Sequence, residues 1–295
     1  MSRVYDALQQ SISGVDTATL QTSSADAVFA KQFPDSGWDP NAAPSVQPDL
    51  FEQERLPALF SVHSLASEQF RLLATRLQQL QHSRLLKSVL VTSAVAGEGK
   101  SLLSFNLAVS LAQGGRQKIL LIDADLRKPG LPVTIDVNGR ARLREWHQTQ
   151  CPISECICRV ADLNVWLVPA GQLIVDPLEL LKSPRISDLF SFVNAAFDWV
   201  LIDAPPLLPL ADAEILSRLC DATILVVRHD RSPKRALKQA LERVPAAKLA
   251  GLLLNGFPVV NTYGYRQYAI EQDSNKPRGN GRAAASGNGS PGKVG

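Results

Sequence analysis

A glycine-rich turn between an apolar run and a helical stretch carries the clearest chemical signal in this sequence. The run "SVLVTS" leads into "AVAGEGKS", where two glycines precede a lysine and a serine. This spacing is typical of a phosphate-binding P-loop, whose backbone N–H groups surround phosphate oxygens at the start of a helix. The pattern therefore predicts a nucleotide site. Its residues are Ala94, Val95, Ala96, Gly97, Glu98, Gly99, Lys100, Ser101 and Leu102.

Acidic residues follow two other apolar runs. The segment "LLIDADLRKP" places Asp123 and Asp125 just past one run, and "VLIDAPP" places Asp203 at the end of another. Carboxylates beside a P-loop can hold Mg²⁺, order its waters or accept a proton from an attacking hydroxyl, while the Ser101 hydroxyl binds the metal. A carboxylate that only caps a helix or a turn is the structural alternative. Arg127, two residues after Asp125, either contacts phosphate or stays solvated.

Six apolar runs of strand length alternate with helical stretches between residues 88 and 255. They are "SVLVTS", "KILLID", "NVWLVP", "DWVLIDAP", "ATILVV" and "GLLLN", and a further helix is predicted over residues 67–80. Continuous hydrophobicity indicates strands buried on both faces, and interleaved helices indicate parallel crossovers. The expected fold is α/β, a doubly wound and mostly parallel sheet with ligands at the carboxyl ends of its strands.

The two ends of the chain differ in composition from this central part. Residues 1–60 read as a short amphipathic helix over residues 3–11 followed by a disordered linker, because the stretch rich in Pro, Asp and Ser shows no periodicity. Residues 61–260 form the expected catalytic domain. Residues 261–295 read as a flexible tail that contains tyrosines and ends in a low-complexity stretch.

Composition excludes several classes of function. The net charge of +3 comes without a basic stripe interleaved with aromatic residues, so we expect no nucleic-acid partner. No stretch approaches the roughly 18 apolar residues of a membrane span, and no signal-peptide pattern opens the chain, so we expect a cytoplasmic protein. Four cysteines are too sparse for a disulfide framework, and partly buried thiols are the expected role.

Three motifs in order carry a family resemblance. "GEGKS", "LLIDADLRKP" and "VLIDAPPLLPLADA" resemble the Walker A, A′ and B motifs of the bacterial tyrosine kinases of capsule and exopolysaccharide synthesis, the CpsD/CapB type. The similarity extends over residues 63–268. It implies a P-loop fold related to the MinD-like ATPases and an ATP- and Mg²⁺-dependent kinase that phosphorylates tyrosines on its own tail and on other proteins. Such a kinase regulates polysaccharide chain synthesis or export.

The resemblance also implies roles for individual residues. Lys100 neutralises phosphate charge, Asp123 accepts the proton of the tyrosine, and Asn255 in "LLLNGF" lies on the adenine side of the nucleotide. By itself, an asparagine that closes a buried strand is more often a turn residue. The implied metal ligands are Ser101, Asp125 and Asp203. The implied catalytic set is Lys100, Asp123, Asp125 and Arg127.

A nucleotide-switched ATPase or scaffold of the MinD/ParA type, without phosphotransfer, is the alternative. Those proteins carry a signature lysine two residues before the first invariant glycine of the loop, and this chain has Val95 there. A valine cannot neutralise phosphate charge across a dimer interface. The sequence therefore favours the kinase.

The tail and the assembly helix bear on substrates and partners. Three tyrosines within six residues are the expected phosphate acceptors: Tyr263, Tyr265 and Tyr268. The family pattern implies a transmembrane co-polymerase that activates the kinase at the membrane, a cognate tyrosine phosphatase and a homo-oligomer. The family's assembly motif Glu-x-x-Arg-x-x-Arg is incomplete here, because Ala74 stands in place of the last arginine, so oligomer size is left open. Ala96 also replaces the proline usual before "GEGKS".

Overall fold

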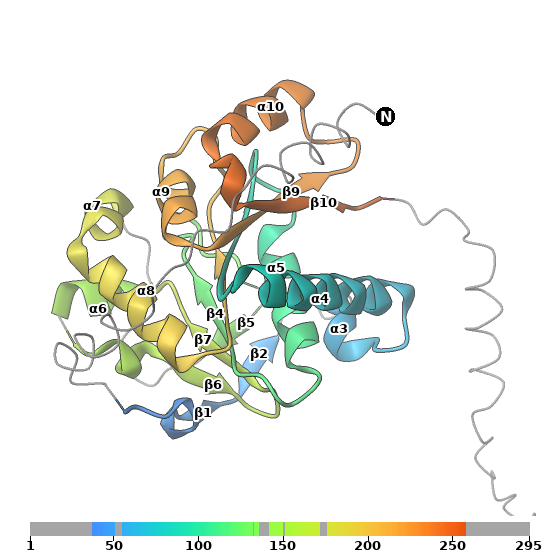
Figure 1. Cartoon of the computed structure of the whole chain (residues 1–295). Helices are drawn as coiled ribbons and strands as arrows, with labels where there is room; N and C mark the ends of the chain where they lie inside the picture. Colours follow the sequence, from blue (N-terminus) through green and yellow to red (C-terminus); the bar gives the residue numbers. More distant parts are fainter. Residues whose placement is uncertain are drawn as a thin grey trace, which may run out of the picture.

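An eight-stranded sheet forms the centre of the molecule (Figure 1). The computed structural model describes residues 37–50, 55–131, 133–135, 142–149, 151–171 and 176–257. The strand order is β1-β6-β7-β4-β8-β3-β9-β10, and the strands from β7 to β10 all run parallel, whereas β6 pairs antiparallel with β7. The strands are β1 (Ser45–Val46), β3 (Ser88–Ser93), β4 (Ile119–Asp123), β6 (Cys158–Val160), β7 (Val165–Val168), β8 (Trp199–Asp203), β9 (Ala222–Arg228) and β10 (Leu249–Asn255).

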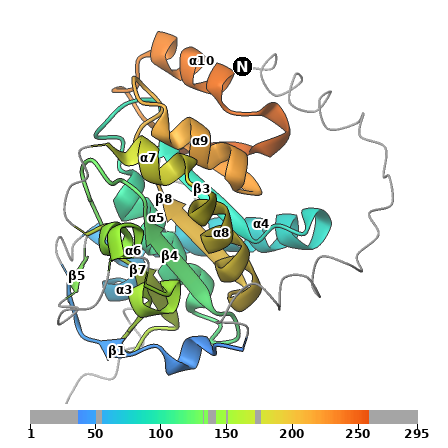
Figure 2. The ribbon, with the colours of Figure 1, turned by 90° about the vertical axis from the view of Figure 1, so that its left-hand side faces the viewer.

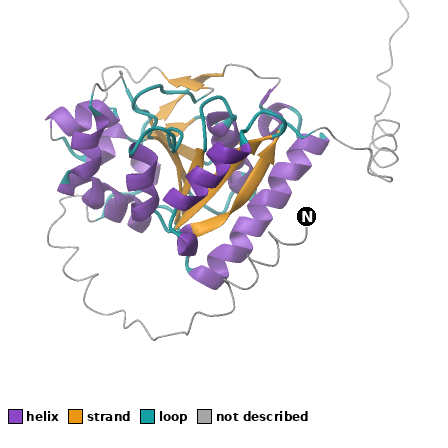
Figure 3. Ribbon diagram, turned by 90° about the horizontal axis from the view of Figure 1, so that it is seen from above, coloured by secondary structure: helices purple, strands orange, loops and turns teal. Residues whose placement is uncertain are grey.

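Helices cover both faces of this sheet. Figure 2 looks onto the face covered by α6 to α9, and Figure 3 shows helices on either side of the strands. The helices are α3 (Pro57–Phe60), α4 (Leu65–Arg84), α5 (Lys100–Ala112), α6 (Leu143–Thr149), α7 (Pro177–Lys182), α8 (Pro184–Ala196), α9 (Asp212–Leu219) and α10 (Lys234–Arg243). Short 3₁₀ turns are η1 (Pro40–Ala42), η3 (Ile153–Cys156) and η4 (Ala246–Lys248), and a separate antiparallel pair joins β2 (Pro48–Leu50) to β5 (Val133–Ile135). Among these described helices, none combines the length and apolar character needed to cross a bilayer.

The central strands are buried on both faces, as their continuous hydrophobicity predicts. In β4, Ile119 and Leu121 pack with α3, α4 and α5, whereas Leu120 and Ile122 pack into the cluster on the opposite face. Successive side chains of a strand point to opposite faces, so an unbroken apolar run supplies both cores. The six predicted strands and the doubly wound, mostly parallel sheet are confirmed.

The predicted linker before residue 60 is partly wrong. The Trp166 indole N–H donates to the Pro40 carbonyl at 2.7 Å, and β1 pairs with β6 at the edge of the sheet. Farther along, Leu56 is fully buried, and the Asn106 side chain accepts a hydrogen bond from the Ala58 N–H at 3.1 Å. A buried leucine contributes about 2 kcal/mol, which lets a segment without periodicity pack on a surface built by other elements. Residues 1–36 and 261–295, with the predicted first helix and the tail, lie outside the described residues.

The long helix α4 contains the incomplete assembly motif. The Ser64 side chain caps its N-terminus, and Leu85 ends it in a left-handed conformation with φ of 53°. Arg71 bonds to Glu68 and to the Val62 carbonyl, so these two motif residues are engaged within the chain. Ala74 is only 4% exposed, because it faces the core beneath α4. An arginine could not occupy that position without burying its charge.

Candidate functional site

The phosphate loop runs from the end of β3 to the first residue of α5. Gly97 and Gly99 have φ values of 82° and 92°, which side-chain-bearing residues rarely adopt, and Gly99 is the N-cap of α5. A Cβ on Gly99 would lie 2.2 Å from the Asn255 Nδ2 atom. The positive φ therefore favours glycine here, and the Asn255 side chain at the end of β10 would have to move to admit a Cβ. The loop has the strand-to-helix setting that a nucleotide site needs.

Three acidic residues meet this loop at the carboxyl edge of the sheet. Asp123 and Asp203 stand opposite one another in the β4–β8 register, and the Asp203 carbonyl accepts a hydrogen bond from the Ala124 N–H at 2.8 Å. Asp125 follows in the turn after β4, where its carboxylate accepts a hydrogen bond from the Lys128 N–H at 3.0 Å. Parallel neighbours in the strand order bring together carboxylates that lie 80 residues apart.

Burial dominates the electrostatics of this cluster. Asp203 is fully buried, and this burial raises its pKa to about 7, although hydrogen bonding to Ser101 and the charge of Lys100 oppose the rise. Burial also raises the pKa of Asp123 well above its ordinary value, and the nearby charge of Asp203 raises it further. The pKa of Asp125 is raised by burial too, against the Lys128 N–H and the Lys100 ammonium. The site therefore favours binding of a cation.

The residues present fit a Mg²⁺ ion that arrives with nucleotide. The Oδ2 atom of Asp203 is buried without a hydrogen-bond partner, while its Oδ1 accepts a hydrogen bond from Ser104 Oγ at 3.3 Å. Ser101 Oγ lies 3.0 Å from where a Cβ on Gly130 would be, so the turn after β4 lies directly over the serine. In the described part of the chain, no three side chains form a ready metal cage. Mg²⁺ does not need one, because it is usually held by one or two carboxylates, waters and substrate phosphates.

Arg127 is held by a residue that sequence reasoning missed. Its guanidinium makes two hydrogen bonds to Asp212 at the first turn of α9, at 2.7 and 3.2 Å. Asp212 is 2% exposed, and hydrogen bonding to it raises the pKa of Arg127. The pair ties the turn after β4 to the segment after β8, with Arg127 one third exposed toward solvent. An aspartate at the start of a helix, three residues after a proline, reads as a simple N-terminal charge, so its partner could not be foreseen.

Asn255 reaches the phosphate loop from the end of β10. Its side-chain N–H donates to the Glu98 carbonyl at 2.8 Å. The residue is thus part of the site wall, in addition to closing a strand. Within the predicted loop, Val95 and Leu102 pack their side chains against the two apolar clusters.

The comparisons with known proteins agree with this geometry. A family model described as AAA domain matches residues 86–250. Tyrosine-protein kinase YwqD of Bacillus subtilis is 34% identical over 72% of this chain and 91% of that protein, and the putative tyrosine-protein kinase CapB of Staphylococcus aureus is 32% identical over 70% and 90%. This chain belongs to the bacterial tyrosine-protein kinases. Family membership decides between the kinase and the MinD/ParA-type alternative.

Solved structures of this kinase family share the fold. The kinase domain of the Escherichia coli tyrosine kinase ETK superposes with a TM-score of 0.63 at 26% identity, covering 71% of this chain and 82% of that one. The chimerical protein CapA2B2 gives a TM-score of 0.62 at 27% identity, covering 73% and 93%. The kinases named wzc from Salmonella are longer, because the match covers 76% of this chain and only 32% of theirs.

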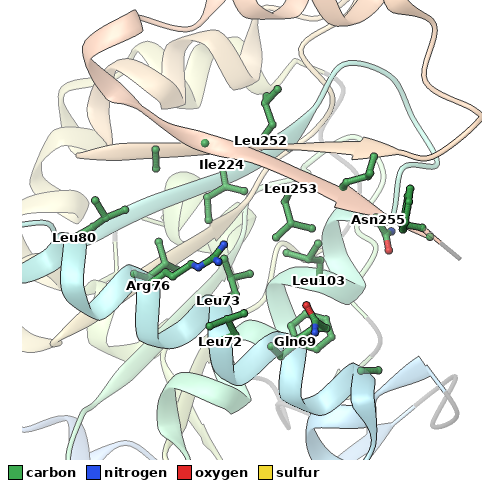
Figure 4. A pocket seen from close by; sticks show the side chains of 18 of the residues that line it. Gln69, Leu72, Leu73, Arg76, Leu80, Leu103, Ile224, Leu252, Leu253 and Asn255 are labelled. Carbon is green, nitrogen blue, oxygen red and sulfur yellow. The ribbon is translucent and has the colours of Figure 1, made fainter. Parts of the chain in front are cut away.

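The kinase also has an apolar hollow of about 820 Å³ between α4 and β10 (Figure 4). Leucines from both elements line it, with Gln69 and Arg76 from α4 and Asn255 at one end. Its apolar lining differs from the charged carboxyl edge, so it is not the phosphate site. The predicted acceptor tyrosines 263, 265 and 268 lie outside the described residues.

Proposed function

We propose that this kinase binds ATP at the phosphate loop and transfers the γ-phosphoryl group to tyrosine hydroxyls. The observation that carries the proposal is the convergence of Lys100 with Asp123, Asp125 and Asp203 at one edge of the sheet. A phosphate loop alone would support binding. A carboxylate cluster that can hold a metal and accept a proton adds what transfer requires.

Each side chain then has a distinct task. Lys100 is buried at the start of α5 and offsets negative charge on the β- and γ-phosphates. Ser101, Asp125 and Asp203 would hold Mg²⁺, and the charge of the ion would offset that of the phosphate oxygens. Asp123 accepts the phenol proton as the tyrosine oxygen bonds to the γ-phosphorus. The bond to the β,γ-bridging oxygen breaks, and ADP leaves.

The environment of Asp123 suits a general base. Burial and the charge of Asp203 raise the pKa of Asp123. A general base works best when its pKa lies near the operating pH, because it is then often deprotonated and still basic enough to accept a proton. The Asp125 N–H donates to its Oδ1 at 3.2 Å and keeps the carboxylate oriented. We further propose that Arg127, which Asp212 holds and which is one third exposed, contacts the phosphates.

The acceptors we propose are the three tail tyrosines. Asn255 lies beside the phosphate loop, and Tyr263 follows eight residues later. An extended segment of that length spans at most about 28 Å, enough to reach the site of a neighbouring molecule. Each phosphate adds roughly −1.5 to −2 charges, which would repel the tail from an acidic site. We therefore expect phosphorylation to loosen an assembly that the tail bridges.

The proposed cellular setting follows from the family resemblance. We place the kinase in the cytoplasm, recruited to the membrane by a transmembrane polysaccharide co-polymerase whose cytoplasmic segment activates it, with a cognate tyrosine phosphatase reversing the reaction. The pathway would be capsule or exopolysaccharide synthesis or export. Support comes from the wzc kinases, which extend well beyond the region matched here.

Phosphopeptide mass spectrometry after incubation with Mg-ATP tests the proposal, with Lys100→Met as the inactive control. Methionine keeps the side-chain length and removes the charge at the phosphates. We expect phosphate on the peptide spanning residues 261–272 in the wild type, and at least a hundredfold less in Lys100→Met. Replacing the three tail tyrosines with phenylalanine should remove most of the label while ATP binding persists.

Two results would contradict the proposal. Equal labelling of Lys100→Met would remove the loop from the mechanism. ATP binding without any phosphotyrosine, even with a partner's cytoplasmic segment added, would favour a nucleotide-switched scaffold instead.

A further inference from the structure

Glu98, the residue between the two glycines of the phosphate loop, has a buried side chain with two defined partners. It is 2% exposed. The Ser232 hydroxyl donates to its Oε1, and the Val95 N–H donates to its Oε2 at 3.1 Å. One carboxylate oxygen is thus bonded within the loop, and the other is bonded to the turn between β9 and α10.

Ser232 is itself held in place by that turn. Its Oγ accepts a hydrogen bond from the Arg228 N–H at 2.7 Å, and its own N–H donates to the Arg228 carbonyl at 3.1 Å. The neighbouring His229 N–H donates to the Asn255 carbonyl at 2.8 Å. The Asn255 side chain then returns to the Glu98 carbonyl at 2.8 Å. These bonds close a circuit through the loop, the turn and the end of β10.

We propose that Glu98 and Ser232 form a clamp that positions the phosphate loop and Asn255 for nucleotide. The inference rests on the proposed ATP site and adds two positioning residues to it. A loop that must present several N–H groups to phosphate binds better if it is ordered beforehand. A carboxylate buried at the loop is costly without partners, so loss of the Ser232 hydroxyl strains the loop itself.

A second substitution can test whether Glu98 and Ser232 interact directly, because it should rescue the defect caused by the first. Ser232→Asp places a second carboxylate against Glu98, and two buried like charges repel. Glu98→Gln removes one charge and supplies an amide that can donate to the new aspartate. If the two positions interact as a pair, the second substitution must relieve the damage caused by the first.

The experiment measures two quantities in the full chain. The first is the Kd for a fluorescent ATP analogue. The second is amide hydrogen exchange over residues 95–101 in nucleotide-free protein. The variants are Ser232→Ala, Ser232→Thr, Ser232→Asp, Glu98→Gln and the double variant Glu98→Gln with Ser232→Asp. Matched controls are Ser187→Ala and Ser187→Asp on the exposed side of α8.

We expect Ser232→Ala to raise the Kd about tenfold and to speed exchange over the loop, because it removes a hydrogen bond to a charged group. Threonine keeps the hydroxyl and should stay within about threefold of the wild type. Aspartate at this position should be the weakest binder, and the added Glu98→Gln should recover at least tenfold of its loss. The Ser187 variants should behave like the wild type.

The clamp is overturned if Ser232→Ala leaves both the Kd and the loop exchange unchanged, or if Glu98→Gln gives no recovery in the Ser232→Asp background. Failure of the wild-type protein to bind the ATP analogue would count against the proposed function instead. The exchange measurement needs no nucleotide, so it would still decide whether Ser232 orders the loop.

Discussion

Replacing Asp203 with asparagine should flatten the pH dependence of stability in the metal-free kinase. Burial raises the pKa of Asp203 from 3.8 to about 7 in the folded protein. A difference of about 3 pH units corresponds to about 4 kcal/mol. The value is an upper bound for the apo protein, because Asp123 and Asp203 share their site and one proton relieves both.

The sign follows from which state holds the proton. Between pH 4 and 7 the folded protein keeps a proton on the Asp123–Asp203 pair, whereas the unfolded chain releases it. The contribution of Asp203 to the free energy of unfolding therefore falls as pH rises through this window and is level above it. Removing the charge of Asp203 also lowers the pKa of Asp123, because that charge is one cause of its rise. Asp203→Asn should then lose at least half of the wild-type slope.

Urea denaturation at pH 5, 6, 7 and 8 with a metal chelator measures the effect. Asp188→Asn, on the exposed side of α8, is the matched control and should keep the wild-type slope. The slope is compared instead of the stability at one pH, because the asparagine amide also needs a hydrogen-bond partner. A wild-type slope retained by Asp203→Asn would refute the inference that this buried carboxylate carries a raised pKa.

Three further substitutions test contacts seen in the structure. Gly99→Ala should weaken ATP binding at least tenfold, because the residue has a positive φ and the new Cβ would lie 2.2 Å from the Asn255 side chain. Gly114→Ala is the control and should leave ATP binding unchanged, because a Cβ there meets open space. Equal affinities of the two variants for ATP would show that the loop can adjust. Asp212→Asn should lower the free energy of unfolding by about 2 kcal/mol, because it breaks the partly buried ion pair with Arg127. Glu214→Gln should lower it by less than about 0.5 kcal/mol, because the ion pair of Glu214 with Arg218 is exposed. Urea denaturation measures both losses, and equal losses would contradict the argument from burial. Ala74→Arg should lower the free energy of unfolding by about 3 kcal/mol or more, because it buries a charge. Urea denaturation measures this loss, and light scattering measures assembly. A variant that is as stable as the wild type and assembles more would show that α4 can present this position to solvent.

The incomplete assembly motif has a structural meaning that its spacing does not convey. Glu68 and Arg71 bond to one another, and Ala74 packs into the core below α4. A substitution that looks like one lost arginine in the sequence is a small residue fitted to a buried position. Assembly through this helix would have to use other residues of its exposed face.

Local patterns predict the loop conformation and the strands well where one segment carries the whole signal. Glycines before Lys100 predict the phosphate loop, and continuous apolar runs predict the six parallel strands. They do not predict contacts between segments. Asp212 is paired with Arg127, and Ser232 with Glu98, across 85 and 134 residues respectively. In neither pair does the sequence around one residue identify its partner.

The first sixty residues also show that local patterns do not predict contacts between distant segments. Their composition predicts a linker, yet Pro40 accepts a hydrogen bond from the Trp166 indole and Leu56 is fully buried. A segment that packs on a surface made by other elements needs only a few well-placed apolar residues. Periodicity detects elements that carry their own amphipathic face, and this segment does not.

The sequence by itself determined the strands, the phosphate loop and the identity of the acids, because those depend on hydrophobic runs and on glycine conformations within a few residues. Only the tertiary structure decided that Asp123 faces Asp203, that Arg127 is held by Asp212, and that Ser232 reaches Glu98. The strand order of the sheet sets these neighbours. Their burial then sets the raised pKa values, and both arise from packing between segments that are distant in the chain.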